Sequence, residues 1–365
     1  MPPPAGSAAE DAPRVEPPPG GVGRLLRSRG AQVAISLLLA AGLLYFFLSR
    51  VQFEPLARAI GSASAPWLLL GVAISLATFA MRAIRWMALL RPVGRVPFLP
   101  AFLATALGFA ANNLPAKAGE VIRPAVLARA RRLPFSALLA SILFERALDG
   151  ASVVIFFLVA VLLGFPGAVV GPAAFARLRT AAWIGAGVFA ALIGLAFLLL
   201  VRRDLTERLF ERLAPRLPER WRDRARSALV SFPEGFASLA DPRLFASVAA
   251  QSILMWLVIN VQVYTVLRAF GIVLPFAASF VVTCAAVLGL AVPTPGGIGS
   301  YQAALQYTLT RFFGVPLGPA SGFAVIAWAI SFVPITLIGL AGLGTPVLRA
   351  PSSGVGGRES TDGRR

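Results

Sequence analysis

Histidine is absent from this chain of 365 residues, cysteine occurs once as Cys284, and lysine occurs once as Lys117. The lack of histidine excludes His-ligated metals, Ser-His catalytic sites and proton relays through imidazole. A single cysteine excludes an intrachain disulfide and a cysteine-based zinc site. We therefore predict no metal, no cofactor and no catalytic residue, and we expect that the protein is not an enzyme.

Acidic residues are few, 16 against 34 Lys and Arg, which gives a net charge of +18. In a soluble protein this excess would suggest nucleic acid. Here 57% of the residues are hydrophobic and the mean hydropathy is +0.77, whereas soluble domains are about 45–50% apolar. We therefore predict a multi-pass membrane protein without a nucleic-acid partner, whose arginines face the cytoplasm and an anionic lipid surface.

Six apolar segments approach or exceed the ~20 residues that a membrane-spanning helix needs. They are 31–48, 66–90, 134–165, 179–201, 243–270 and 317–345. Two shorter apolar runs, 98–113 and 276–292, each end in a helix-breaking motif, NNLPAKAG at 112–119 and PTPGGIGS at 293–300. These shorter runs are not long enough to be treated as membrane spans like the other six segments.

The distribution of arginines along the chain indicates how the two shorter runs lie in the membrane. If 98–113 crossed the membrane, Arg123 and the basic residues 129–132 would face outside, against the positive-inside rule. We predict that the run enters and turns back, so that these arginines stay cytoplasmic together with Arg82, Arg85, Arg91 and Arg95. The same argument makes 276–313 a hairpin from the outer face, with about 26 basic residues inside and about 6 outside.

The predicted fold is an all-α polytopic membrane protein with about six full spans and two re-entrant helical hairpins in an inverted repeat. The repeat halves are 31–165 and 179–345, within a membrane domain 31–345, and such repeats are a transporter architecture. Residues 1–30 and 346–365 are predicted disordered cytoplasmic tails. The Arg-rich connector 202–242 is either an amphipathic element on anionic lipid or a solvated cytoplasmic loop.

Six charged residues lie in apolar surroundings between positions 112 and 149. They are Lys117, Glu120, Arg123, Glu145, Arg146 and Asp149. A charge at the centre of a membrane helix costs roughly 3 kcal/mol or more. Because the six charges sum to zero, we predict a compensated polar cluster that faces the protein interior and handles a charged lipid headgroup.

Two alternatives remain for each half of this cluster. At the first break, Asn112 and Asn113 end a helix, Gly119 allows the reverse turn, and the next helix begins near 120–124. Its free N–H groups, with Arg123, suit a phosphate or carboxylate, or Glu120 only pairs with its basic neighbours. Likewise the i,i+4 pair of acids at 145 and 149 contacts a cationic or proton-coupled group, or it locks the hairpin to the helix.

The second break contains Pro293, Pro295, Gly296, Gly297 and Gly299. Two prolines and three glycines so close together predict an unwound backbone with free carbonyl and amide groups, opposite the first hairpin. The alternative is that the glycines only let helices pack closely.

The segments PAKAGEVIRPAVLARARRLPFSALLASILFERALD and PTPGGIGSYQAAL resemble the membrane region shared by bacterial lysylphosphatidylglycerol synthases and stand-alone flippase-like proteins. The resemblance extends over about 31–345. In the synthases an aminoacyl transferase domain follows this region, and the membrane part moves the lipid across the bilayer. No such domain follows residue 345 here, so the resemblance implies translocation without synthesis.

The resemblance also implies site residues. The substrate-binding set that we expect is Asn112, Asn113, Lys117, Glu120, Arg123, Glu145, Arg146, Asp149, Pro293, Pro295, Gly296, Gly297, Gly299 and Gln302. The chain departs from the family pattern at Gln302, where many relatives carry Glu, and at Ala327 and Trp328, near which many carry Arg.

We therefore expect a protein that flips or scrambles a lipid with a charged headgroup, a phospholipid or a polyprenyl-linked lipid. Its partners are membrane lipids, and its location is the bacterial inner membrane with both termini in the cytoplasm. The alternatives are a polytopic glycosyl- or acyl-transferase acting on lipid-linked substrates, and a membrane scaffold that does not transport.

Overall fold

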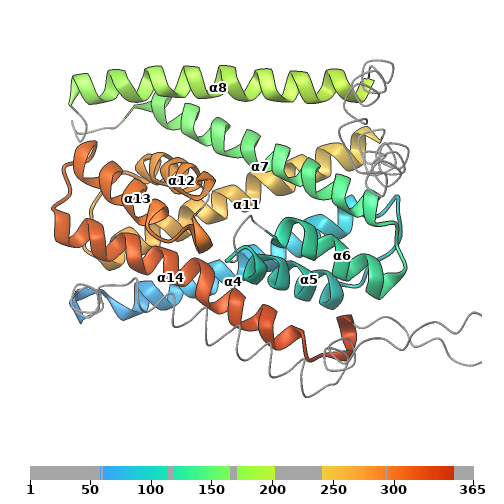
Figure 1. Ribbon diagram of the computed structural model, residues 1–365. Helices are drawn as coiled ribbons and strands as arrows, with labels where there is room; N and C mark the ends of the chain where they lie inside the picture. The colour runs from blue at the N-terminus through green and yellow to red at the C-terminus, as the bar shows by residue number, and fades with distance from the viewer. Residues whose placement is uncertain are drawn as a thin grey trace, which may run out of the picture.

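The computed structural model describes residue 58 and residues 61–113, 118–164, 171–201, 241–292 and 294–348. Within these residues the chain forms helices and no strand (Figure 1). The predicted all-α fold is thereby confirmed. Residues 1–48 and 349–365 lie outside the described residues, as do residues 202–240 of the connector. Three residues of the tail predicted to be disordered, Pro346–Leu348, form a 3-10 turn instead.

Among the described helices, four are long and apolar enough to cross a membrane. They are α4 (Ala65–Leu89), α7 (Phe135–Leu163), α11 (Pro242–Ala269) and α14 (Leu317–Gly342). At 1.5 Å per residue, 25 to 29 residues give about 38–44 Å, more than the ~30 Å hydrocarbon core. They match four predicted spans. The predicted span 179–201 lies within α8 (Pro172–Val201), which begins seven residues earlier.

Proline marks the beginning of four helices. Pro97, Pro134, Pro275 and Pro316 each occupy the position directly before a helix. Proline disfavours helical backbone in the residue before it, and it has no N–H that would need a partner at a helix end. The local sequence therefore sets where these helices begin.

Two pairs of short helices follow the predicted hairpin pattern. The pairs are α5 (Phe98–Ala111) with α6 (Gly119–Arg131), and α12 (Phe276–Ala291) with α13 (Ser300–Arg311). Helices α5 and α12 have 14 and 16 residues, about 21 and 24 Å, too short to cross the ~30 Å core. Figure 1 shows the two pairs at opposite sides of the molecule.

The residues that precede α5 lie next to the residues that follow α6. A Cβ atom added to Gly94, just before α5, would lie 2.8 Å from Leu133 Cδ2, just after α6. The chain thus runs out along α5 and returns along α6. That the pair enters and leaves one face of a bilayer stays a prediction.

Corresponding helices of the two halves run in opposite directions. At one end of the α4–α11 contact, Ser64 N donates to Ala269 O at 2.8 Å. At the other end, Arg85 Nη1 donates to Ser252 Oγ at 2.8 Å. The other contacts are exchanged in the same way, since α5 packs on α14 and α12 packs on α7. This arrangement is the one that an inverted repeat requires.

Candidate functional site

Helix α7 carries the two acidic residues around which the polar cluster is built. Glu145 and Asp149 lie four residues apart on one face of α7, and both are buried. Asp149 is the central residue of this 29-residue helix, so its carboxylate lies far from either end. Like charges at this spacing repel and buried charges need partners, and the contacts below supply cationic partners for both acids.

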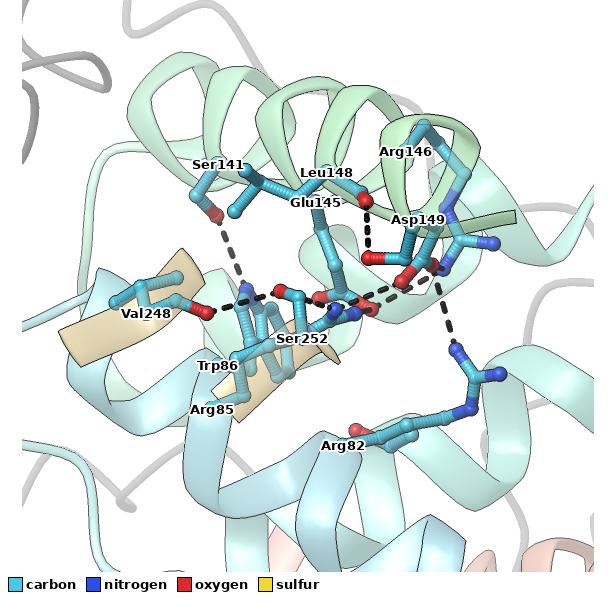
Figure 2. A network of polar contacts seen from close by, with 12 residues as sticks. Arg82, Arg85, Trp86, Ser141, Glu145, Arg146, Leu148, Asp149, Val248 and Ser252 are labelled. Carbon is cyan, nitrogen blue, oxygen red and sulfur yellow. Dashed lines mark hydrogen bonds and ion pairs between the residues drawn. The ribbon is translucent and has the colours of Figure 1, made fainter. Parts of the chain in front are cut away.

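Arg85 of α4 contacts both acids (Figure 2). Its Nη1 atom donates to Asp149 Oδ1 at 2.7 Å, and its Nη2 atom lies 3.1 Å from Glu145 Oε1. Arg82, three residues earlier, lies 3.4 Å from Asp149 Oδ2. The sequence pattern counted both arginines with the cytoplasmic charges, but both are buried inside the protein. These two side chains are buried because α4 packs against α7 and α11. A count of the charges in each loop takes no account of such packing.

Arg123 and Arg146 complete the basic side of the cluster. Arg123 of α6 donates to Glu145 Oε1 at 3.0 Å, and its guanidinium lies 4.0 Å from the centre of the Trp86 ring. Arg146 lies 3.1 Å from Glu145, 3.3 Å from Asp149 and 3.9 Å from Glu120. Its side chain remains 37% exposed, unlike the others. The predicted lock between hairpin and helix is therefore present as the pair Arg123–Glu145.

The cluster carries a net positive charge, whereas the sequence predicted a neutral one. Within the described residues, four arginines at 82, 85, 123 and 146 face three acids at 120, 145 and 149, which leaves one positive charge. Lys117, the remaining predicted member, lies outside the described residues. The net charge differs from the predicted one because Arg82 and Arg85 join the cluster from another helix, α4, and were not assigned to it from the sequence.

Several buried polar atoms of the cluster have no hydrogen-bond partner among the described residues. They are Arg85 Nε and Nη2, Arg123 Nε and Nη2, Arg146 Nε and Glu145 Oε2. A buried donor or acceptor left without a partner costs about 1–3 kcal/mol. Five of the six atoms are donors, so the cluster can donate further hydrogen bonds to oxygen atoms of water or of an anion.

Helix α11 brings the second half of the chain to the cluster. Trp256 Nε1 donates to Asp149 Oδ1 at 2.9 Å, and Ser252 Oγ accepts from Arg85. On the first half, Trp86 Nε1 donates to Ser141 Oγ at 3.0 Å (Figure 2). Sequence reasoning missed these four residues, because neutral polar groups in an apolar helix carry no charge pattern. Arg82 and Arg85 did carry a signal, since both lie within the apolar run 66–90.

The two chain breaks meet inside the protein. Asn113 Nδ2 donates to Thr336 Oγ1 at 3.0 Å, and a Cβ atom added to Gly296 would lie 3.1 Å from Asn113 Oδ1. Trp328 Nε1 donates to the Gly296 carbonyl at 2.8 Å. The predicted position of the second break opposite the first is thereby confirmed.

The glycines of the second break have the unwound backbone that was predicted. Gly296, Gly297 and Gly299 have φ angles of 61°, 69° and 88°, a region that favours glycine. Gln302 Oε1 accepts from Gly299 N at 2.8 Å, so this side chain caps the beginning of α13. Pro295 lies in the same 3-10 turn as Gly296 and Gly297. Pro293 lies outside the described residues.

Gly119 has a different role from the predicted one. It is the first residue of α6 and is absent from the residues with positive φ, so it supplies no reverse turn. A Cβ atom there would lie 1.8 Å from the Gly108 carbonyl oxygen and 2.6 Å from Asn112 Oδ1. Gly119 therefore allows α5 and α6 to approach closely and keeps Asn112 at their junction.

The two halves place different chemistry at corresponding positions. Arg85 and Gln262 each stand 20 residues after the first residue of α4 and of α11, respectively. Asp149 and Ser331 each stand 14 residues after the first residue of α7 and of α14. Gln262 Nε2 donates to Ser331 Oγ at 3.2 Å, which is the neutral counterpart of the Arg85–Asp149 pair. At these corresponding positions the first half has a charged pair and the second half has a neutral polar pair.

Comparisons with known proteins agree with this architecture. The family model for the lysylphosphatidylglycerol synthase TM region matches residues 33–339. A UPF0104 membrane protein from Methanothermobacter thermautotrophicus is 26% identical over 290 residues, which cover 75% of this chain and 82% of that relative.

Proposed function

This chain belongs to the lysylphosphatidylglycerol synthase TM region family, and from that membership we propose that it moves a lipid with a charged headgroup between the leaflets of a membrane. The lipid is a phospholipid or a polyprenyl-linked lipid, and the movement is flipping or scrambling without a covalent step. We place the protein in the bacterial cytoplasmic membrane with both termini in the cytoplasm, because the arginine excess follows the positive-inside rule in that orientation.

One observation carries the proposal: buried arginines with unpaired donors lie where the two opposed halves meet. Arg85 contacts Asp149 of its own half and Ser252 of the other half. Charged groups inside membrane helices are costly, and they commonly line the path of a polar substrate. A cluster used only to hold helices together would need no excess charge and no unpaired donors.

The proposed mechanism follows from the arrangement of the two halves. A headgroup leaves water and exchanges its hydration for hydrogen bonds from arginine side chains of the first half. The unwound backbone around Gly296 and the Gln262–Ser331 pair offer neutral hydrogen-bonding groups on the second half. The acyl chains stay in the bilayer throughout. The movement is downhill or is coupled to an ion.

Reconstitution in lipid vesicles tests the proposal. The purified protein is incorporated into vesicles that contain lipids labelled on the headgroup, and a membrane-impermeant quencher reports the label left on the inner leaflet. We expect faster loss of protected label than in protein-free vesicles for at least one headgroup. Equal rates in both kinds of vesicle for anionic, zwitterionic and cationic headgroups would refute the function.

Two variants test whether the lipid moves past the charged cluster or crosses the membrane elsewhere. Arg123→Gln removes one of the arginines that contact Glu145 in the cluster, whereas Arg91→Gln changes an exposed arginine just after α4. Slower label movement with Arg123→Gln, and unchanged movement with Arg91→Gln, are the expected results. Equal movement with both variants would mean that the lipid crosses elsewhere.

A further inference from the structure

A cavity of about 130 Å³ lies between the two halves, next to the charged cluster. A single water needs roughly 10–15 Å³ of such space, so the cavity has room for several waters or for a small polar group. Helices of both halves form its wall, including α4, α5, α11, α12 and α14. The first half contributes Arg82 and Phe109, and the second half contributes Trp256, Gln262, Tyr301 and Ser331.

Arg82 is the one charged side chain among the described residues that line this cavity, and no carboxylate lines it. Its contact with Asp149 is long, 3.4 Å, while Asp149 also accepts at 2.7 Å from Arg85 and at 2.9 Å from Trp256. Asp149 is therefore satisfied mainly by other groups. Arg82 keeps most of its donating capacity for a group inside the cavity.

Arg82 already occupies two of the aromatic faces that line the cavity. The Arg82 guanidinium lies 5.2 Å from the Phe109 ring centre and 5.8 Å from the Trp256 ring centre. Aromatic faces attract cations within about 6 Å, and here the protein's own arginine occupies them. A ligand cation that entered would also meet the net positive charge of the cluster.

The second half contributes neutral polar groups to a lining that is mostly apolar. Gln262 and Ser331 are joined by a hydrogen bond of 3.2 Å, and they correspond by position to Arg85 and Asp149. Their remaining donor and acceptor sites can bind hydroxyl or ester oxygens. The cavity thus contains one cation and several neutral hydrogen-bonding groups. A phosphate can bind to the cation, and neutral polar atoms next to the phosphate can bind to the neutral groups.

We propose that this cavity binds the phosphate group of a headgroup that carries no compensating cation, with Arg82 as the residue that contacts the phosphate. The inference rests on the proposed function and names its substrate class: an anionic lipid is accepted, while zwitterionic and cationic headgroups are disfavoured. Arginine suits this task because its planar guanidinium donates two parallel hydrogen bonds to phosphate oxygens.

A binding measurement that does not depend on transport tests the inference. The detergent-purified full chain is titrated with short-chain phospholipids of anionic, zwitterionic and cationic headgroups, and in a separate arm with inorganic phosphate, while thermal unfolding is recorded. The anionic lipid is expected to raise the unfolding temperature most. If inorganic phosphate raised the unfolding temperature as much as the anionic lipid does, the assignment to a lipid headgroup would be overturned. The cavity would then be a site for free phosphate.

Two variants and one control locate the effect. Arg82→Gln should weaken binding of the anionic lipid by about 10- to 100-fold, the loss of one charged hydrogen-bond donor. Arg91→Gln, at an exposed position just after α4, should leave the binding of the anionic lipid unchanged. Retained preference for the anionic lipid in Arg82→Gln, or equal binding of the cationic lipid by the unaltered protein, would overturn the inference.

Arg82→Gln is expected to fold, because Asp149 keeps its shorter contacts. A second variant, Ala286→Leu, fills the cavity without altering any charge, since Ala286 lines it. It should weaken binding of the anionic lipid as well, and unchanged binding would also count against the site. Selective binding without vesicle transport would refute only the proposed function, whereas transport without headgroup selectivity would refute only this inference.

Discussion

The indole Nε1 of Trp256 donates a hydrogen bond of 2.9 Å to Asp149 Oδ1, and this bond joins the two halves of the protein. Both residues lie near the middle of long helices, α11 and α7. The charged cluster is therefore part of the contact between the halves. A change in how the halves pack will therefore alter the environment of Asp149.

Arg85 should be the arginine on which stability depends most. It is fully buried and contacts Glu145, Asp149 and Ser252. Removing one partner from a buried ion pair costs about 3–5 kcal/mol, because the remaining charges are left uncompensated. Arg85→Gln is therefore expected to lower the free energy of unfolding in detergent by that amount. Arg91→Gln is the control, and similar stabilities of the two variants would contradict the prediction.

Gly119→Ala should separate α5 from α6. The added Cβ atom would lie 1.8 Å from the Gly108 carbonyl oxygen, so the helices must move apart. Overpacking of this kind typically costs about 1–3 kcal/mol. Gly185→Ala in α8 is the matched control, since nothing lies within 4 Å of its added Cβ atom. Thermal unfolding of both variants measures the difference, and an unaffected Gly119→Ala protein would show that the close approach is dispensable.

Gly296→Ala tests the meeting of the two breaks. Gly296 and Gly314 have similar φ angles, 61° and 65°, so alanine pays a comparable backbone cost of about 1–2 kcal/mol at each. Only at Gly296 would the new Cβ atom also approach Asn113 Oδ1, at 3.1 Å. We expect Gly296→Ala to reduce both stability and lipid movement more than Gly314→Ala does. Equal effects would assign the loss to backbone conformation alone.

Cysteine labelling tests the predicted topology of the hairpins. In a Cys284→Ser background, single cysteines replace Arg95 and Arg132, exposed residues that flank the α5–α6 pair. Both should react with an impermeant reagent only from the cytoplasmic side. Val273→Cys and Leu317→Cys, exposed positions that flank α12–α13, should react only from the outside. Labelling of the two members of either pair from opposite sides would contradict the re-entrant hairpins.

Membrane helices were predictable here because the signal is local. Length and hydropathy identified 66–90 and 134–165 as spans. The prolines that precede four of the helices are also a local signal, although the prediction from the sequence did not use them. The i,i+4 spacing placed Glu145 and Asp149 on one face before any contact was known. The repeat could be inferred from the order of long and short apolar runs together with the arginine count, since neither property depends on the partners of an individual side chain.

Only part of the ion pairing could be predicted, because partners from other helices depend on which helices come together. Sequence spacing predicts neighbours within one helix, such as Arg146 beside Asp149, and the predicted lock of hairpin to helix is the pair Arg123–Glu145. Arg82 and Arg85 of α4 also pair with the acids of α7, and no sequence spacing predicted this. This packing also changed the cluster from neutral to positive. The role of Gly119, the meeting of Asn113 with Gly296, and the cavity beside Arg82 likewise exist only where separate helices touch.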